Sequence, residues 1–159
     1  MGTGHLKEIV PALIKPSKKL DKDYSGQYDF VLPFNKKQIK IEVKASRAVE
    51  FRKDEPLYVK ALSIKSKKPF DMNFQQVKPK CCEVFVWVAV WRDVIKYWVL
   101  PSSVVEKNKY YSKGQHRGNK GEGQLHLNQD NMKEFINYEF KSTELEKAIQ
   151  DAYIKQTGQ

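Results

Sequence analysis

The stretch of sequence that decides the fold is "YDFVLPFNKKQIKIEVKAS", residues 28–46. Apolar and polar residues alternate on both sides of a polar centre, a pattern typical of two half-buried strands. Asn35 and Lys36 occupy that centre, and asparagine is common in the tight turns of β-hairpins. We therefore predict a β-hairpin that turns at residues 35–36.

This turn position sets the strand register, because paired residues then have numbers that sum to 71. Asp29 falls opposite Glu42, with Cβ atoms about 4.5–5.5 Å apart, and Lys44 points to the same side as Glu42. A longer loop would shift this pairing. One face is thus expected to hold two carboxylates and an ammonium group, with Val31 as its apolar exception. The residues expected on the opposite, apolar face are Tyr28, Phe30, Leu32, Ile39, Ile41 and Val43.

Two carboxylates placed this closely repel each other unless a cation lies between them. Mg²⁺ suits such a position, because it takes oxygen ligands and keeps several waters. Beside a phosphate, Mg²⁺ polarises the phosphoryl oxygen and lowers the pKa of a coordinated water. Lys44 would then orient the water and offset negative charge in the transition state. The alternative is an exposed hairpin face with ordinary charges, since Glu-x-Lys arises often by chance.

The net charge of the 159-residue chain is +10, from 29 Lys and Arg against 19 Asp and Glu. Such an excess favours a polyanionic partner, and nucleic acid is the first candidate. The alternative is a charge that serves solubility alone. Three basic clusters favour nucleic acid: residues 15–22 "KPSKKLDK", 65–68 "KSKK" and 107–120 "KNKYYSKGQHRGNK".

Composition narrows the class of protein further. A chain of this length with 40% hydrophobic residues suits one domain over residues 1–159, either a whole enzyme or the catalytic part of a larger one. We expect no membrane span and no signal peptide. Cys81 and Cys82 are adjacent and therefore a poor disulfide pair, so a reducing, cytoplasmic setting is expected. His5, His116 and His126 lack the spacing of zinc ligands.

The rest of the chain predicts helices around a sheet. A helix with apolar residues from Leu6 to Ile14 is interrupted at Pro11, and residues 67–79 are expected to hold a short helix. Residues 81–91 read as a buried central strand that forms a hairpin with 94–101, and further short helices are expected within 102–111 and 128–140. The last helix has a capping box at Thr143 and Glu146 and one apolar stripe. The expected class is α/β, with a mixed central sheet flanked by helices.

Asp29 and the run Glu42-Val43-Lys44 resemble the active-site motif of the PD-(D/E)XK nuclease superfamily, the restriction-endonuclease-like enzymes. Glu8, in the first predicted helix, is similar to the helical glutamate of that superfamily. The residue before Asp29 is Tyr28 rather than proline. Over roughly residues 5–100, the order of predicted elements resembles the αβββαβ core of the family.

The resemblance implies a restriction-endonuclease-like core and a Mg²⁺-dependent DNA endonuclease, most simply of the type II restriction kind, that leaves 5′-phosphates. Asp29, Glu42 and the Val43 carbonyl would bind Mg²⁺, for which Mn²⁺ can substitute, and Lys44 would position the water. Cutting both strands of double-stranded DNA favours a homodimer. Two alternatives stay open: a Holliday-junction resolvase or DNA-repair nuclease, and a nucleic-acid-binding module without catalysis.

The sequence contains further candidate site residues beyond this motif. Glu8 would act as a metal-shell or water-positioning carboxylate. Gln76, with Gln75, would hold a water or phosphate from the end of a helix. For each of them, the alternative is a surface residue without a role in the site. Ser46 shares the face of Lys44 and is expected to contact DNA with Arg47. The Gly-rich run 112–124 carries side chains suited to phosphates and base edges, although a loop without a role remains the alternative. Its candidate DNA contacts are Lys113, Gln115, His116, Arg117, Asn119 and Lys120.

Overall fold

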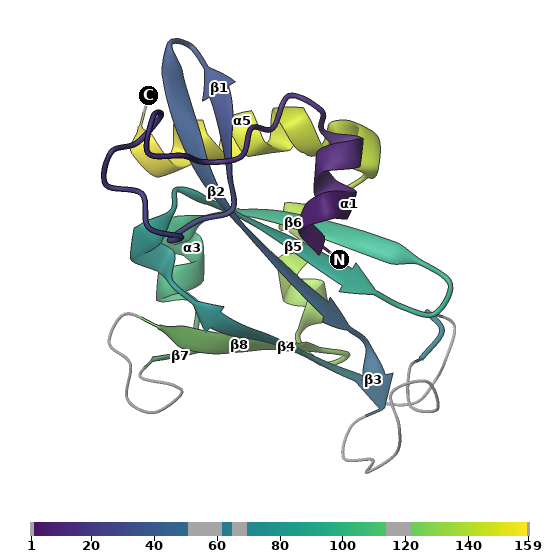
Figure 1. Ribbon diagram of the computed structural model, residues 1–159. Helices are drawn as coiled ribbons and strands as arrows, with labels where there is room; N and C mark the ends of the chain where they lie inside the picture. The colour runs from purple at the N-terminus through teal and green to yellow at the C-terminus, as the bar shows by residue number, and fades with distance from the viewer. Residues whose placement is uncertain (1, 51–61, 65–69, 114–121, 159) are drawn as a thin grey trace.

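The computed structural model describes residues 2–50, 62–64, 70–113 and 122–158. Figure 1 shows three layers: two helices, a five-stranded sheet (sheet A) and a four-stranded sheet (sheet B). The strand order is β1-β2-β5-β6-β9 in sheet A and β3-β4-β8-β7 in sheet B. The predicted α/β class is therefore confirmed, and the central sheet is mixed, with helices on one face and a second sheet on the other.

The opening hairpin forms as predicted. It consists of β1 (Phe30–Phe34) and β2 (Lys37–Arg47), which pair antiparallel with Phe30 opposite Ile41, so paired numbers sum to 71. Asn35 and Lys36 make the turn with φ angles of 49° and 63°. Two positive φ angles match the hairpin turn whose twist agrees with that of the strands.

Sheet A grows outward from this hairpin. β5 (Val84–Val90) pairs parallel with β2 and antiparallel with β6 (Ile95–Pro101), and β6 pairs with the short edge strand β9 (Glu139–Phe140). Residues 84–89 of β5 are all buried, because both faces of this strand are covered. The predicted central strand and its hairpin with the following strand are thus confirmed.

Two helices cover the first face of sheet A. α1 (Gly2–Ile9) ends before Pro11, and α5 (Leu145–Thr157) closes the described chain. The predicted capping box of Thr143 and Glu146 does not form. Instead a short 3₁₀ turn, η3 (Ser142–Glu144), leads into α5, and the Glu144 carboxylate accepts the Lys141 N–H at 2.8 Å. The apolar stripe of α5 is buried as predicted: Leu145, Ala148, Ile149, Ala152 and Tyr153.

Sheet B covers the second face. It contains β3 (Val49–Glu50), β4 (Phe70–Val77), β7 (Tyr111–Lys113) and β8 (Gly123–Asn128). The helix predicted within 67–79 is wrong, since Met72 and Phe74 bury alternate side chains, which is the period of a strand. The Phe74 ring stacks on Trp87 with centroids 4.9 Å apart. The two sheets therefore share one apolar core.

Short helical segments complete the second layer. They are η1 (Pro79–Cys81), α3 (Ser102–Lys107) and the 3₁₀ helix η2 (Met132–Tyr138). No helix in the described part of the chain is long and apolar enough to span a membrane.

The predicted division of side chains between the two hairpin faces is wrong for Tyr28 and incomplete for Val31. Val31 is buried in the second core cluster, and Tyr28 joins it there instead of packing with Phe30. The chain is not yet in a regular strand at Tyr28, so strict alternation begins only after Asp29. The face that carries Glu42 is therefore covered by sheet B and is not an open surface.

Candidate active site

Glu42 lies in the middle of β2, between β1 and β5. Its position in a central strand leaves the residue only 6% exposed, which is unusual for an acidic side chain. Lys44, two residues further along β2, points to the same side and places Nζ 3.5 Å from Glu42 Oε1. The predicted pairing of a carboxylate and an ammonium group on one strand face is therefore present.

Asp29 lies immediately before β1, and backbone contacts fix it against β2. Its N–H donates to the Ile41 carbonyl at 2.9 Å. Its Oδ2 accepts the backbone N–H of Val43 at 2.7 Å. This second bond brings the Asp29 carboxylate to the residue next to Glu42, so the structure brings Asp29, Glu42 and Lys44 together.

The electrostatics of Glu42 reflect its burial. Burial raises the pKa of the Glu42 carboxyl, and the nearby Asp29 charge raises it further, while Lys44 and Lys78 lower it. Among the described residues, Glu42 Oε2 is buried without a hydrogen-bond partner. An unpaired buried carboxylate oxygen costs free energy, so Glu42 is poised to accept a proton or a cation.

A hard divalent cation fits this donor set. Asp29 and Glu42 offer carboxylate oxygens close enough for their charges to interact, and one oxygen of Glu42 has no hydrogen-bond partner among the described residues. Among the described residues, no group of three or more His, Cys, Asp and Glu side chains forms a metal site. Two carboxylates suit Mg²⁺, which usually retains waters and takes its remaining ligands from substrate phosphates.

Sequence reasoning missed two neighbours of Glu42. Lys78 follows β4, and its charge favours the ionised form of Glu42. Cys82 is 6% exposed, and burial, followed by the Glu42 charge, raises the pKa of its thiol. The signal in the sequence is the run "KPKCC", residues 78–82, in which Lys78 and Cys82 lie within six residues before the buried strand β5.

Gln76 does not lie at a helix end. It is exposed in an irregularity of β4, where the register with β8 shifts between Phe74 and Val77. Its φ angle is 52°, a conformation that costs a non-glycine residue about 1 kcal/mol or more and that clusters at functional sites. The distorted strand end leads directly to Lys78.

Glu8 is exposed on α1. Leu6 and Val10 of that segment pack into the core cluster on the first face of sheet A, which is opposite to the face of Glu42. No described contact joins Glu8 to Asp29, Glu42 or Lys44, so its role stays a prediction.

The predicted DNA contacts fall at the ends of strands. Ser46 and Arg47 close β2, with Arg47 exposed, and Lys113 is exposed at the end of β7. Predicted contacts also lie outside the described residues: Gln115, His116, Arg117, Asn119 and Lys120. Their roles stay predictions.

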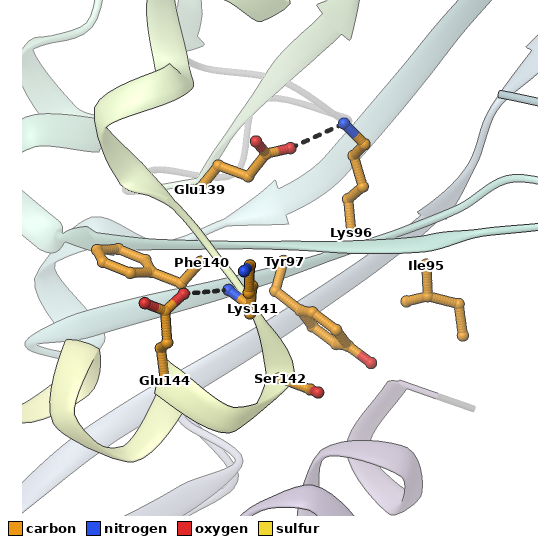
Figure 2. Close-up of a pocket in the computed structure, with 8 residues that line it drawn as sticks. All are labelled: Ile95, Lys96, Tyr97, Glu139, Phe140, Lys141, Ser142 and Glu144. Carbon is orange, nitrogen blue, oxygen red and sulfur yellow. Dashed lines mark hydrogen bonds and ion pairs between the residues drawn. The ribbon is translucent and has the colours of Figure 1, made fainter. Parts of the chain in front are cut away.

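A separate surface cavity of about 480 Å³ lies at the opposite edge of sheet A, beside β9. Figure 2 shows residues that line it, among them Tyr97 and the ion pair of Lys96 Nζ with Glu139 Oε1, which are 3.0 Å apart. None of Asp29, Glu42 and Lys44 lines this cavity.

No protein-family model matches the sequence, and no curated protein is significantly similar to it. Among solved structures, a bacterial homing endonuclease aligns with 99% of this chain and 91% of its own, at 14% identity and a TM-score of 0.45. These values are too low to establish a shared fold or activity, so a functional assignment depends on the geometry and charge of the site.

Proposed function

We propose that this chain is a metal-dependent DNA endonuclease with a restriction-endonuclease-like core. The observation that carries the proposal is the buried Glu42, which lies with Asp29 and Lys44 in a strongly basic protein and has one oxygen without a partner among the described residues. Such a carboxylate does not stabilise an apolar core, because a neutral side chain at the same position would be buried at a lower cost in free energy. A role in binding a cation explains why it is there.

In this proposal, Asp29 and Glu42, together with the Val43 carbonyl, hold Mg²⁺ or Mn²⁺. The bound ion would lower the pKa of a coordinated water and polarise the scissile phosphate. Lys44 orients the attacking water and offsets charge on the phosphate. The water oxygen forms a bond to phosphorus, the bond from phosphorus to O3′ breaks, and a proton reaches O3′. The products are a 5′-phosphate and a 3′-hydroxyl.

The substrate class in the proposal is double-stranded DNA, cut in the manner of a type II restriction enzyme. The positive net charge supports a polyanionic substrate. Ser46, Arg47 and Lys113, which end strands β2 and β7, are proposed DNA contacts, and Glu8 and Gln76 are proposed supporting residues.

The proposal is tested by plasmid cleavage in Mg²⁺, with EDTA as the metal-free reference. Lys44→Ala is expected to lower the cleavage rate by about 10²–10³-fold, the usual loss when one transition-state donor is removed. Lys96→Ala is the matched control, since it also removes a lysine from an ion pair in sheet A, but beside β9. Equal cleavage by the wild type and Lys44→Ala would remove the assigned mechanism.

The choice of substrate separates the related activities. Cleavage at defined positions in linear duplex DNA supports the restriction-type reading. Preferential cleavage of four-way junctions would replace it with junction resolution. Salt-dependent DNA binding without Mg²⁺-dependent cleavage would replace it with a non-catalytic binding module.

A further inference from the structure

The first basic cluster, residues 15–22, contacts Tyr28, the residue before Asp29, through Asp21. It belongs to the segment that joins α1 to β1, drawn as the dark trace between these elements in Figure 1. Lys15, Lys18, Lys19 and Lys22 all lie in this segment, and all four are exposed. None of them belongs to the proposed catalytic set of Asp29, Glu42 and Lys44.

One end of the segment is anchored through Asp21. Oδ2 of Asp21 accepts a hydrogen bond from the Tyr28 hydroxyl at 2.8 Å and lies 3.6 Å from Lys40 Nζ. Tyr28 is 3% exposed in the core beneath sheet A, and it directly precedes Asp29. The anchor is therefore one residue from a proposed metal ligand.

Backbone contacts hold the other end. Ile14 and Val31 exchange two hydrogen bonds of 2.9 Å, which attach the start of the segment to β1. The Ser17 carbonyl then accepts the N–H groups of Leu20 and Asp21 at 3.1 and 3.0 Å. These bonds define a turn, so the lysines are displayed on a folded loop with a fixed path.

The acidic and basic side chains of this loop have different surroundings. The bond from Tyr28 lowers the pKa of the Asp21 carboxyl, so Asp21 stays ionised while it faces its anchors. Among the described residues, no acidic side chain forms an ion pair with Lys15, Lys18, Lys19 or Lys22. A surface with several such ammonium groups complements a polyanion, and lysine binds phosphate as a point charge.

We propose that residues 15–22 form a phosphate clamp that binds the DNA backbone on the Asp29 side of the cleavage position. The inference rests on the proposed function, because it takes its polyanion to be the DNA substrate. The Asp21–Tyr28 bond sets the loop before DNA arrives, which reduces the ordering cost of binding. The clamp is a binding element and takes no part in the chemical step.

The test compares two double variants with the same loss of charge. Lys18→Gln/Lys19→Gln alters the clamp, and Lys141→Gln/Lys147→Gln removes two exposed lysines near the start of α5. Binding of a fluorescent DNA duplex is measured by anisotropy at several KCl concentrations, without Mg²⁺. The clamp variant is expected to make the slope of log K against log salt shallower by about 1.8, or about 0.9 for each lost phosphate contact. A slope equal to that of the α5 control would overturn the clamp.

A kinetic readout separates binding from chemistry. With Mg²⁺, the clamp variant is expected to raise KM for DNA and to leave kcat unchanged, because it removes binding that substrate and transition state share. A fall in kcat at saturating DNA would contradict a purely binding role. Unchanged thermal unfolding confirms that these exposed substitutions leave the fold intact.

The two proposals fail in different ways. A wild-type protein that neither binds nor cleaves DNA would refute the proposed function and the clamp together. A wild type that binds and cleaves, while the clamp variant keeps its salt slope and KM, would refute the clamp alone.

Tyr28→Phe tests whether the loop is ordered before DNA binds, since it removes the hydrogen bond to Asp21 without changing charge. Its affinity is expected to fall by about threefold or more at an unchanged salt slope, and unchanged affinity would refute the presetting.

Discussion

At the residue scale, the burial of Glu42 sets its proposed function against the stability of the fold. Its carboxylate is nearly inaccessible, yet one oxygen lacks a partner and only Lys44 forms an ion pair with it among the described residues. Burying a carboxylate in this way costs free energy unless a cation compensates. On the proposed function, a bound metal would supply this compensation, and the metal-free protein would carry the cost.

Glu42→Gln is therefore expected to stabilise the metal-free protein at neutral pH by about 1 kcal/mol, the usual gain when a destabilising functional residue is neutralised. The pKa of Glu42 is raised in the folded state, so the protonated wild type keeps its full stability below the ordinary carboxyl pKa of 4.5. It loses that stability as the pH rises through the folded-state pKa. Glu42→Gln should therefore be more stable than the wild type only at pH values above the folded-state pKa of Glu42.

Thermal unfolding at pH values from 4 to 8 in EDTA measures this difference. Added Mg²⁺ should raise the melting temperature of the wild type, because it binds the folded state, but not that of Glu42→Gln. A glutamine variant that is less stable than the wild type at pH 8 in EDTA, or equally stabilised by Mg²⁺, would contradict the role assigned to Glu42.

At the scale of elements, the β1–β2 hairpin positions the site. Its turn places two non-glycine residues at positive φ, Asn35 at 49° and Lys36 at 63°. Asparagine tolerates this conformation, but a lysine there carries a backbone strain of about 1 kcal/mol. The hairpin keeps its register because Leu32, Ile39 and Ile41 are buried together on one face, and a one-residue slip would turn the apolar side chains of one strand to the opposite face.

Lys36→Gly is expected to raise the free energy of unfolding by about 1 kcal/mol, because glycine adopts the positive φ without steric cost. Lys37→Gly is the control, since residue 37 begins β2, where glycine weakens the strand. Urea unfolding of both variants gives the comparison. Destabilisation by Lys36→Gly would show that the turn differs from the one described.

At the scale of the whole molecule, sheets A and B enclose a common core, and the candidate site lies on the face of β2 that sheet B covers. The arrangement brings Asp29, Glu42 and Lys44 from the hairpin to Lys78 and the distorted end of β4. The described residues of one chain form one such site, and on the proposed function cutting both strands of a duplex by one mechanism needs two.

The protein is accordingly expected to act on duplex DNA as a homodimer. Sedimentation on a DNA duplex in Ca²⁺, used here to support binding with slow cleavage, should give a complex with two 18.6 kDa chains per duplex. A complex with one chain that still cuts both strands in a single binding event would contradict the homodimer.

The residues that the sequence could predict are those governed by local rules. The Asn35-Lys36 turn fixed the register, and alternation placed Glu42 and Lys44 on one strand face, because strand geometry follows from neighbours in sequence. The buried strand at 84–90 and the apolar stripe of α5 were predictable for the same reason.

Only the tertiary structure decided what covers the Glu42 face. "KKPFDMNFQQVKP", residues 67–79, suggested a helix, but residues 70–77 form β4 because packing against Trp87 and pairing with β8 outweigh local preference. Three features of the site also depend on contacts between segments that meet only in the folded protein. They are the burial of Glu42, the approach of Lys78 and the hydrogen bond that anchors Asp21 to Tyr28. Such contacts depend on which surfaces meet when the sheets pack, and no local pattern of residues encodes them.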